Sequence, residues 1–344
     1  MIKGSQNRDN TNFFLIFLYC RFLLICFAHK IHGISIHWEE VNKLGIGSNS
    51  VKLYLELWQR GFFKTIKSVM DMGSQELMIA EDLLKRMTEN AGLSNYSKEK
   101  FKNLKNFPGY PRCSTKPFYE MLGVEKYSCI DLSKAHGAIP HDLNYPLEDL
   151  TLYGKFDLVT DFGNNEHPFN IGEAYRTMHR LCKPNGYLII QQQLFGGNGY
   201  YNFDQSFFEG IAVANNYKVF FSSYLINPCT NKKSGYADTY HIPANRELLN
   251  VIDLCKVKFI SICYVLQKVV DADFKYPYQG EFDKYLSKNS GYKLQFLNNP
   301  PGRSYSYIPA PLSELTDPPI KITTMLYIIF KRIIKLLKAK LGFR

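Results

Sequence analysis

Between residues 48 and 270 the sequence alternates between short apolar runs and segments whose apolar residues recur at helical spacing. Nearly continuous apolar runs are typical of strands buried on both faces, and their alternation with helices is typical of βαβ units with right-handed crossovers. We therefore expect an α/β fold, with a doubly wound, mostly parallel sheet of seven strands and helical extensions at the N- and C-terminal ends. The expected strands span 68–72, 127–131, 156–161, 187–191, 218–223 and 258–267, and the segment 138–144 supplies a short third strand followed by Asp142.

The segments between these strands carry the usual signals of helix ends. Ser48 or Asn49 can cap the first helix, and Gly61 can end it because glycine adopts the left-handed conformation that follows many helices. Asn170 can cap a later helix in the same way as the first. The remaining helices are expected at 76–87, 118–123 and 207–215.

Composition divides the chain into further segments. Residues 1–47 form an apolar leader or extension, and the domain with the strands covers 48–270. Within that domain, 89–117 are rich in Asn, Lys, Ser, Gly and Pro, which favours an insertion or a lid-like segment. Residues 271–320 form an extension beyond the sheet, and 321–344 have the spacing of an amphipathic helix with a cationic face.

The leader contains an apolar run from Phe13 to Phe27 that is interrupted by Arg21. The run is shorter than the roughly 20 residues that a membrane-spanning helix needs, and no clear cleavage site of the small-x-small type follows it. Three interpretations stay open: a leader outside the fold, a membrane-associated anchor, and an extension from an upstream start codon.

The net charge of +11 is concentrated at the C-terminal end. Residues 321–344 hold seven Lys/Arg and no acid, which leaves about +4 for the rest, so we expect no nucleic-acid partner. The basic helix either packs on the domain or makes peripheral contact with an anionic membrane. The eight cysteines include no CxxC pair, which favours a reducing, cytoplasmic compartment over disulfides or a metal site.

Acidic residues stand at or just after the ends of the first three expected strands. Asp71 lies beside the glycine turn at Gly73, Asp131 ends the second strand, and Asp142 follows the third. The carboxyl ends of parallel strands meet at one edge of a sheet, where open α/β folds bind nucleotide-like ligands. We therefore expect these three carboxylates to converge on one rim.

Four segments, VMDMGSQE, CIDLS, HDLN and FDLVTDFGNNEH…LCKPNGYLII, resemble the class I (Rossmann-like) S-adenosylmethionine-dependent methyltransferases. The resemblance covers roughly 48–270 and implies a sheet of order 3-2-1-4-5-7-6 whose last strand is antiparallel to the others. The first segment departs from the family's D/E-x-G-x-G-x-G pattern, because only Gly73 stands and a serine and a glutamine follow it. In nucleotide-binding folds the acid at the end of the second strand usually follows the glycine turn by about 20 residues, and Asp131 lies far beyond that spacing. An insertion at 89–117 explains the longer distance if that segment folds away from the sheet.

The resemblance implies S-adenosylmethionine as the cofactor, and the chemistry of its adenosine points to particular residues. Asp131 is expected to accept hydrogen bonds from the ribose hydroxyls, which are strong when the acceptor is charged. Leu132, the next residue, is also expected to contact the cofactor. Asp142 is expected to accept from the adenine amine, while the N–H of Leu143 reaches a ring nitrogen.

The other end of the cofactor is expected at the glycine turn and the fourth strand. Asp161 and Phe162 end that strand, so the resemblance places them beside the methyl group. The residues expected at the amino-acid end are Asp71, Gly73, Ser74 and Gln75.

Methyl transfer from a sulfonium is favourable in itself, so alignment and desolvation are the main tasks of such an enzyme. A general base helps when the acceptor is a hydroxyl. Glu166 and His167 are the candidates for that role, because they follow the fourth strand on the ligand edge. Gly196–Phe203, with its glycines and aromatic residues, suits a loop that binds the acceptor.

The sequence thus predicts methyl transfer to a small-molecule, glycan or lipid-precursor acceptor. The incomplete glycine turn keeps a second interpretation open, in which the chain is a non-catalytic, cofactor-binding scaffold or partner protein. NAD is a weaker candidate than S-adenosylmethionine, since neither Gly45–Gly47 nor Gly196–Gly199 stands in the strand-turn-helix context of a dinucleotide site.

Overall fold

A computed structural model describes residues 45–228 and 240–278. The expectations for the apolar leader, for most of the extension after residue 270 and for the basic helix at 321–344 lie outside the described residues. None of the helices in the two described ranges is both long and apolar enough to cross a membrane.

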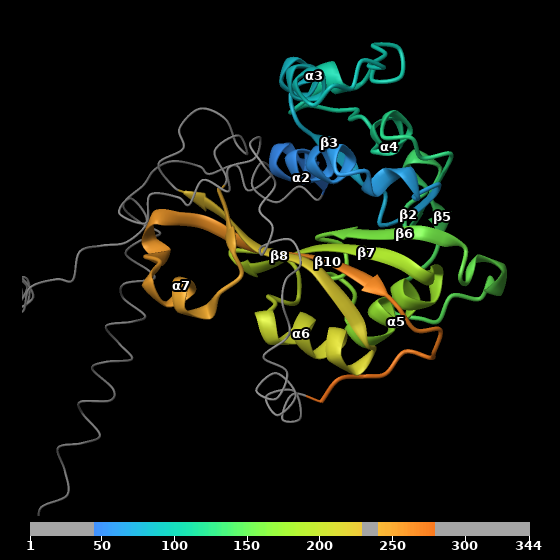
Figure 1. Cartoon of the computed structure of the whole chain (residues 1–344), viewed down its shortest axis with the longest axis vertical. Coiled ribbons are helices and arrows are strands. Elements are labelled where there is room, and N and C mark those ends of the chain that lie inside the picture. Colours follow the sequence, from blue (N-terminus) through green and yellow to red (C-terminus); the bar gives the residue numbers. More distant parts are fainter. Residues whose placement is uncertain (1–44, 229–239, 279–344) are drawn as a thin grey trace, which may run out of the picture. The chain divides into compact units, whose positions relative to one another are not determined.

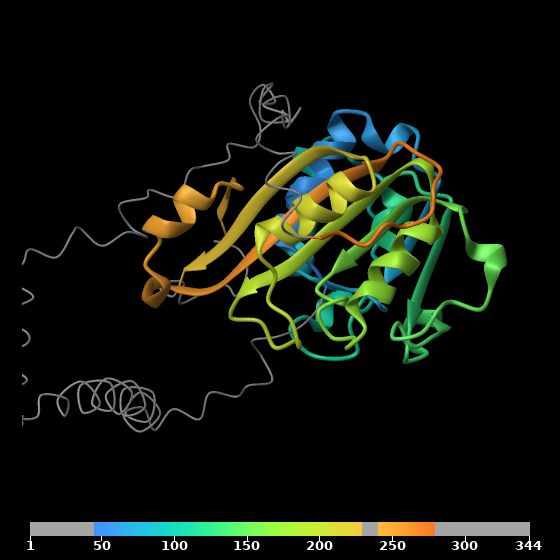
Figure 2. The same ribbon diagram turned by 90° about the horizontal axis from the view of Figure 1, so that it is seen from below.

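The main sheet has eight strands in the order β5-β4-β2-β6-β7-β10-β8-β9. Counted along the chain without the last edge strand, this is the expected order 3-2-1-4-5-7-6, and β10 is antiparallel to both of its neighbours. The strands are β5 (Ile139–Pro140), β4 (Lys126–Asp131), β2 (Ser68–Met72), β6 (Phe156–Phe162), β7 (Cys182–Phe195), β10 (Val257–Lys268), β8 (Tyr217–Pro228) and β9 (Tyr240–Pro243). Figure 2 shows the long strands β8 and β10 running side by side.

The prediction of seven strands is short by one, because β9 pairs antiparallel with the outer edge of β8. This strand is only four residues long and ends in a proline. A proline has no N–H for the hydrogen bonds between strands and is tolerated in an edge strand of a sheet. The segment therefore lacks the sequence pattern of a buried strand.

Helices cover both faces of the sheet, as a doubly wound fold requires (Figure 1). One face carries α2 (Ser48–Gln59), α3 (Glu81–Asn90) and α4 (Lys116–Met121), and the other carries α5 (Ile171–Leu181) and α6 (Gln205–Ala214). Successive strand residues alternate between the two apolar layers, since Val69 packs with the first set and Met70 with the second. A further helix, α7 (Arg246–Val251), precedes β10, and short 3-10 turns span Phe62–Lys64, Leu104–Asn106, Ala135–Gly137, Leu150–Leu152 and Leu254–Lys256.

The segment after the glycine turn does not begin as a helix, so the prediction of a helix over 76–87 is wrong at its start. Glu76–Met78 instead form a short strand, β3, that pairs in parallel with β1 (Gly45–Gly47). Leu77 is fully buried and donates its N–H to the carbonyl of Cys113 at 2.8 Å. Tertiary pairing therefore prevails over the local helical spacing, and α3 begins only at Glu81.

The ends of two helices test the expected caps. Gly47, and not Ser48 or Asn49, precedes the first turn of α2, and both predicted caps lie inside the helix as buried residues. The predicted end is confirmed, since Gly61 has φ +81° and donates to the carbonyl of Trp58 at 2.8 Å. Asn170 caps α5 as expected, accepting a hydrogen bond from the N–H of Glu173.

Residues 89–117 pack on the domain beside the first set of helices. Leu93, Phe101, Leu104 and Cys113 are buried in the same apolar layer as α2 and α4. The segment lies in this layer outside the main sheet, so β2 and β4 still pair in parallel despite the long connection between them.

Candidate functional site

Parallel pairing brings the ends of the strands β5, β4, β2, β6 and β7 to one edge of the sheet. Met72, at the end of β2, is level with Ile130 on one side and with Asp161 on the other. The residues that follow these ends are therefore neighbours in space. We call the segments 73–76, 131–136, 141–145 and 162–167 the carboxyl edge.

The turn after β2 strongly favours a glycine at position 73. Gly73 has φ +86°, and its N–H donates to the carbonyl of Ile130 at 2.7 Å. A Cβ atom on this residue would lie 2.6 Å from Oδ1 of Asn164, in the loop after β6. The close approach locks the β2 turn against the β6 loop, so one glycine serves where the family pattern has several.

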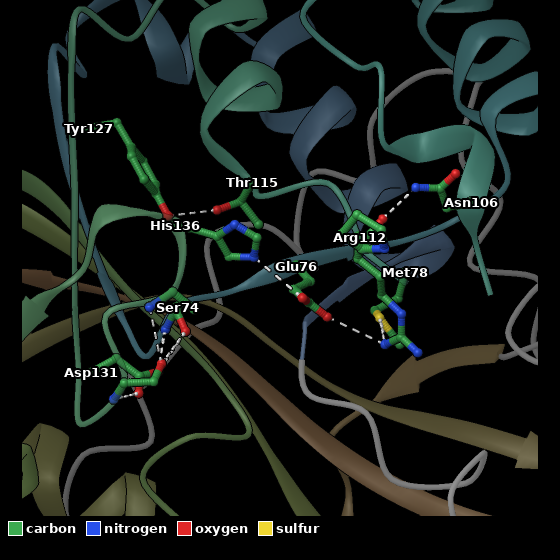
Figure 3. Close-up of polar contacts among 12 residues, drawn as sticks. Ser74, Glu76, Met78, Asn106, Arg112, Thr115, Tyr127, Asp131 and His136 are labelled. Carbon is green, nitrogen blue, oxygen red and sulfur yellow. Dashed lines mark hydrogen bonds and ion pairs between the residues drawn. The ribbon is translucent and has the colours of Figure 1, made fainter. Parts of the chain in front are cut away.

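Ser74 joins the turn directly to the end of β4. Its N–H and its hydroxyl donate to Oδ2 of Asp131 at 2.7 and 2.8 Å, while the N–H of Ser133 donates to Oδ1 at 2.7 Å (Figure 3). Partial burial acts to raise the pKa of Asp131, but these donors outweigh it and lower the pKa below its usual range. Asp131 is therefore a charged, half-buried acceptor at the carboxyl edge.

Asp142 lies next along this edge. The N–H of His141 donates to the carbonyl of Asp131 at 3.0 Å, which holds the two predicted acids close in space. Oδ1 of Asp142 accepts from the N–H and the side-chain amide of Asn144, at 2.9 and 2.7 Å. Leu143 is buried in the core and Leu132 is 72% exposed, so the two leucines beside the acids face opposite environments.

Asp71 does not reach this rim, which corrects the expectation that three carboxylates converge there. Its side chain is fully buried on the face of the sheet that α4 covers. The four hydroxyls that surround the carboxylate belong to Thr115, Tyr119, Tyr127 and Thr160. Burial raises the pKa of Asp71 to about 6, although the four donors act to lower it. The carboxylate thus ties α4 and three strands together inside the protein.

Asp161 and Phe162 also turn into the protein and not toward a ligand. Asp161 is fully buried, accepts hydrogen bonds from the N–H groups of Asn164 and Asn165 at 3.0 and 3.2 Å, and is bound by the side-chain amide of Gln192. Burial raises the pKa of Asp161 to about 7. Phe162 is packed against Tyr54 of α2, with 5.9 Å between ring centroids. Both residues support the loop after β6 from inside the protein, Asp161 through its hydrogen bonds and Phe162 through its packing.

The two predicted bases lie one behind the other. Glu166 is fully buried and accepts from the N–H of Gln193 at 3.2 Å, and its other oxygen lies 4.0 Å from Nε2 of His167. That oxygen has no hydrogen-bond partner among the described residues. The side chain of His167 is 36% exposed. Burial raises the pKa of Glu166 to about 7 and lowers the pKa of His167.

The glycine-rich loop after β7 covers Glu166. A Cβ atom on Gly199 would lie 2.6 Å from Cγ of Glu166, and the N–H of Tyr201 donates to the Glu166 carbonyl at 3.3 Å. Phe169 and Tyr200 are about three-quarters exposed and meet edge to face, with 6.1 Å between their ring centroids. The loop that the sequence assigns to an acceptor thus lies directly on Glu166, one of the two candidate bases.

The structure adds a polar contact at Glu76, which the sequence does not single out, and shows the surroundings of the predicted residue Gln75. Glu76 lies between His136 and Arg112, with oxygen-to-nitrogen distances of 3.3 and 3.4 Å (Figure 3). Gln75 is buried, donates its side-chain amide to the carbonyl of Met72 at 2.7 Å, and has no partner for Oε1 among the described residues. These residues come from segments that are up to 60 residues apart, so no local pattern relates them.

No protein-family model matches the chain, and no curated protein matches its sequence. Solved structures of similar fold do match. Burkholderia thailandensis 1,6-didemethyltoxoflavin-N1-methyltransferase, solved with 1,6-didemethyltoxoflavin and S-adenosylhomocysteine, is 11% identical, with a TM-score of 0.36 over 78% of this chain and 94% of that one.

Two further matches are similar in kind. An S-adenosylmethionine-dependent methyltransferase from Archaeoglobus fulgidus is 13% identical, with a TM-score of 0.32 over 64% of this chain and 95% of that one. A protein of Bacillus halodurans C-125, described only as a candidate methyltransferase, is 13% identical, with a TM-score of 0.30 over 63% of this chain and 99% of that one. Identities and scores this low assign no ligand or activity to the present chain.

Replacing Gly73 by alanine tests the close approach between the β2 turn and the β6 loop. The matched control is Gly92→Ala, because Gly92 has φ +87° but nothing lies within 4 Å of its added Cβ. Both variants carry the backbone strain of about 1–2 kcal/mol. Gly73→Ala should lose about 1–3 kcal/mol more in urea unfolding, since Asn164 must also move. Equal losses in the two variants would contradict the steric argument.

Asp71→Asn tests the buried carboxylate through pH. The pKa of Asp71 is about 6 in the folded state against 3.8 as the ordinary value, so the folded protein binds more protons between these pH values. Wild-type stability should therefore fall relative to the variant by about 1–1.5 kcal/mol from pH 5 to pH 8. Asp157→Asn is the control, because the pKa of Asp157 is lowered and the group stays charged throughout. A difference that does not change with pH would contradict this account of Asp71.

Proposed function

We propose that this protein transfers a methyl group from S-adenosylmethionine to a small-molecule, glycan or lipid-precursor acceptor. One observation carries the proposal: the 3-2-1-4-5-7-6 strand order, with β10 antiparallel, brings the Gly73 turn into direct contact with Asp131 at the carboxyl edge. This is the arrangement that the sequence resemblance implies for the cofactor corner. A cytoplasmic setting, with peripheral membrane contact through 321–344, is part of the same proposal.

The residues at the carboxyl edge fit the parts of this cofactor. Oδ1 of Asp131 takes one hydrogen bond from the protein backbone, so it retains capacity for a ribose hydroxyl. Oε1 of Gln75 is a buried acceptor beside the glycine turn and suits the ammonium of the amino-acid end. Asp142 follows at the end of β5, where the adenine amine is expected. When bound, the cofactor supplies an electrophilic methyl group on sulfur.

His167 is the general base of this proposal, and Glu166 is its positioning residue. A lowered pKa keeps the imidazole neutral at pH 7, which is the form that accepts a proton from the acceptor. Glu166 lies behind the ring at 4.0 Å and is covered by the loop at Gly199, so it reaches the acceptor only through His167. A carboxylate in this position stabilises the imidazolium that forms.

The second candidate function, a cofactor-binding scaffold without catalysis, is favoured by the side chains at the turn. Ser74 and Gln75 replace small family positions, and the hydroxyl of Ser74 is engaged with Asp131. A product assay separates the two, because only the enzyme releases S-adenosylhomocysteine when candidate acceptors are supplied.

Calorimetric titration with S-adenosylhomocysteine tests the cofactor. Wild-type protein should bind it, and Asp131→Asn should bind at least about 10-fold more weakly because charged acceptors make the stronger hydrogen bonds. Asp149→Asn is the matched control, since Asp149 also accepts from a backbone N–H and a hydroxyl, both on Thr151, but precedes β6. No binding to wild-type protein, or equal weakening in both variants, would contradict the proposal.

His167→Ala should lower turnover by about 10²–10⁴-fold while the affinity for S-adenosylhomocysteine stays unchanged. The midpoint of the His167 titration in the acid limb of the wild-type pH profile should lie below pH 6.5, because burial lowers the pKa of His167 from that ordinary value. His141→Ala is the control, since His141 bonds the carbonyl of Tyr145 within its own loop. Undiminished turnover of the His167 variant, measured as S-adenosylhomocysteine released, would remove this residue from the catalytic mechanism.

A further inference from the structure

The carboxylate of Asp131 has an uneven supply of donors. Oδ2 accepts two hydrogen bonds, both from Ser74, at 2.7 Å from the N–H and at 2.8 Å from the hydroxyl. Oδ1 accepts from the N–H of Ser133 at 2.7 Å, and the side chain of Ser133 also helps to lower the pKa of this carboxylate. Each carboxylate oxygen has about two acceptor sites, so Oδ2 is filled and Oδ1 has room for one more donor.

A vicinal diol needs both oxygens of such a carboxylate, one for each hydroxyl. The backbone donors of Ser74 and Ser133 are fixed by the chain at the strand ends. Beside the turn, Gly73 is also tied to β4 through its 2.7 Å hydrogen bond to Ile130. The Ser74 hydroxyl is different, because a rotation about a single side-chain bond removes it from Oδ2. It is therefore the donor that a second diol hydroxyl can replace.

We propose that the hydroxyl of Ser74 competes with the ribose diol for Asp131, and that this competition sets the affinity for the adenosyl cofactor. The inference rests on the proposed function. It assigns to Ser74 a role opposite to that of an ordinary binding residue: its side chain weakens the complex, while its backbone N–H keeps Asp131 charged and oriented.

A second contact keeps the two segments together when the hydroxyl leaves. Glu76 and His136 join the same pair of segments through the 3.3 Å contact between Oε1 and Nε2, and both side chains are about one-fifth exposed (Figure 3). With Gly73 still bound to Ile130, loss of one hydroxyl leaves the turn in place. Truncating Ser74 therefore changes the occupancy of Oδ2 without releasing the turn.

The test is calorimetry on Ser74→Ala and Ser74→Gly, two variants that lack the hydroxyl and keep the N–H. Both should bind S-adenosylhomocysteine about 10- to 100-fold more tightly than wild-type protein, which is the range expected from one hydrogen bond to a charged group. Thr151→Ala removes a hydroxyl that donates to Asp149 in the same manner before β6, and its affinity should not change. An analogue of S-adenosylhomocysteine without the 2′- and 3′-hydroxyls should show no gain.

The outcomes separate this inference from the proposed function. If wild-type protein binds S-adenosylhomocysteine as tightly as both Ser74 variants, or more tightly, the proposed competition is wrong, while the cofactor assignment stands. An equal gain for the analogue without the diol would overturn it as well. If neither wild-type protein nor the variants bind S-adenosylhomocysteine, and all remain folded by thermal melting, the proposed function and this inference fail together.

Discussion

The site depends on one constraint, the parallel pairing of β2 between β4 and β6. The register places Met72 level with Ile130 and with Asp161, so each strand ends at the same edge. Gly73 then meets the β4 backbone on one side and the β6 loop on the other. A one-residue slip would exchange the two faces of β2 and would bury Met70 and Met72 against the wrong helices.

Much of this architecture can be predicted from the sequence, because continuous apolar runs and their turns are local signals. All seven predicted strands occur, and their order agrees with the family that the sequence resembles. The start of α3 cannot be predicted in this way, since Glu76–Met78 pair with β1 and with the carbonyl of Cys113. A helical spacing of apolar residues does not reveal such a distant partner.

The candidate site is less predictable, since side-chain direction decides it. Asp71 stands at a strand end like Asp131, but the pleat directs its side chain toward α4. The hydroxyls there donate hydrogen bonds to its carboxylate or to one another, and the bonded residues are up to 89 positions apart in the sequence. Asp131 escapes this burial at the half-buried end of β4. The partners of Glu76 are likewise brought together only by the fold. An acid at a strand end therefore indicates an edge, but not the side of the sheet.

The structure combines a rigid interior with a polar edge whose donors can exchange. Amide hydrogen exchange with and without S-adenosylhomocysteine tests this account most directly. We expect the ligand to slow exchange in 73–76 and 131–136, and to leave 116–121, which holds Tyr119, a partner of the buried Asp71, unchanged. Protection confined to other parts of the sheet, or no protection at saturating ligand, would contradict the assignment of the carboxyl edge as the cofactor site.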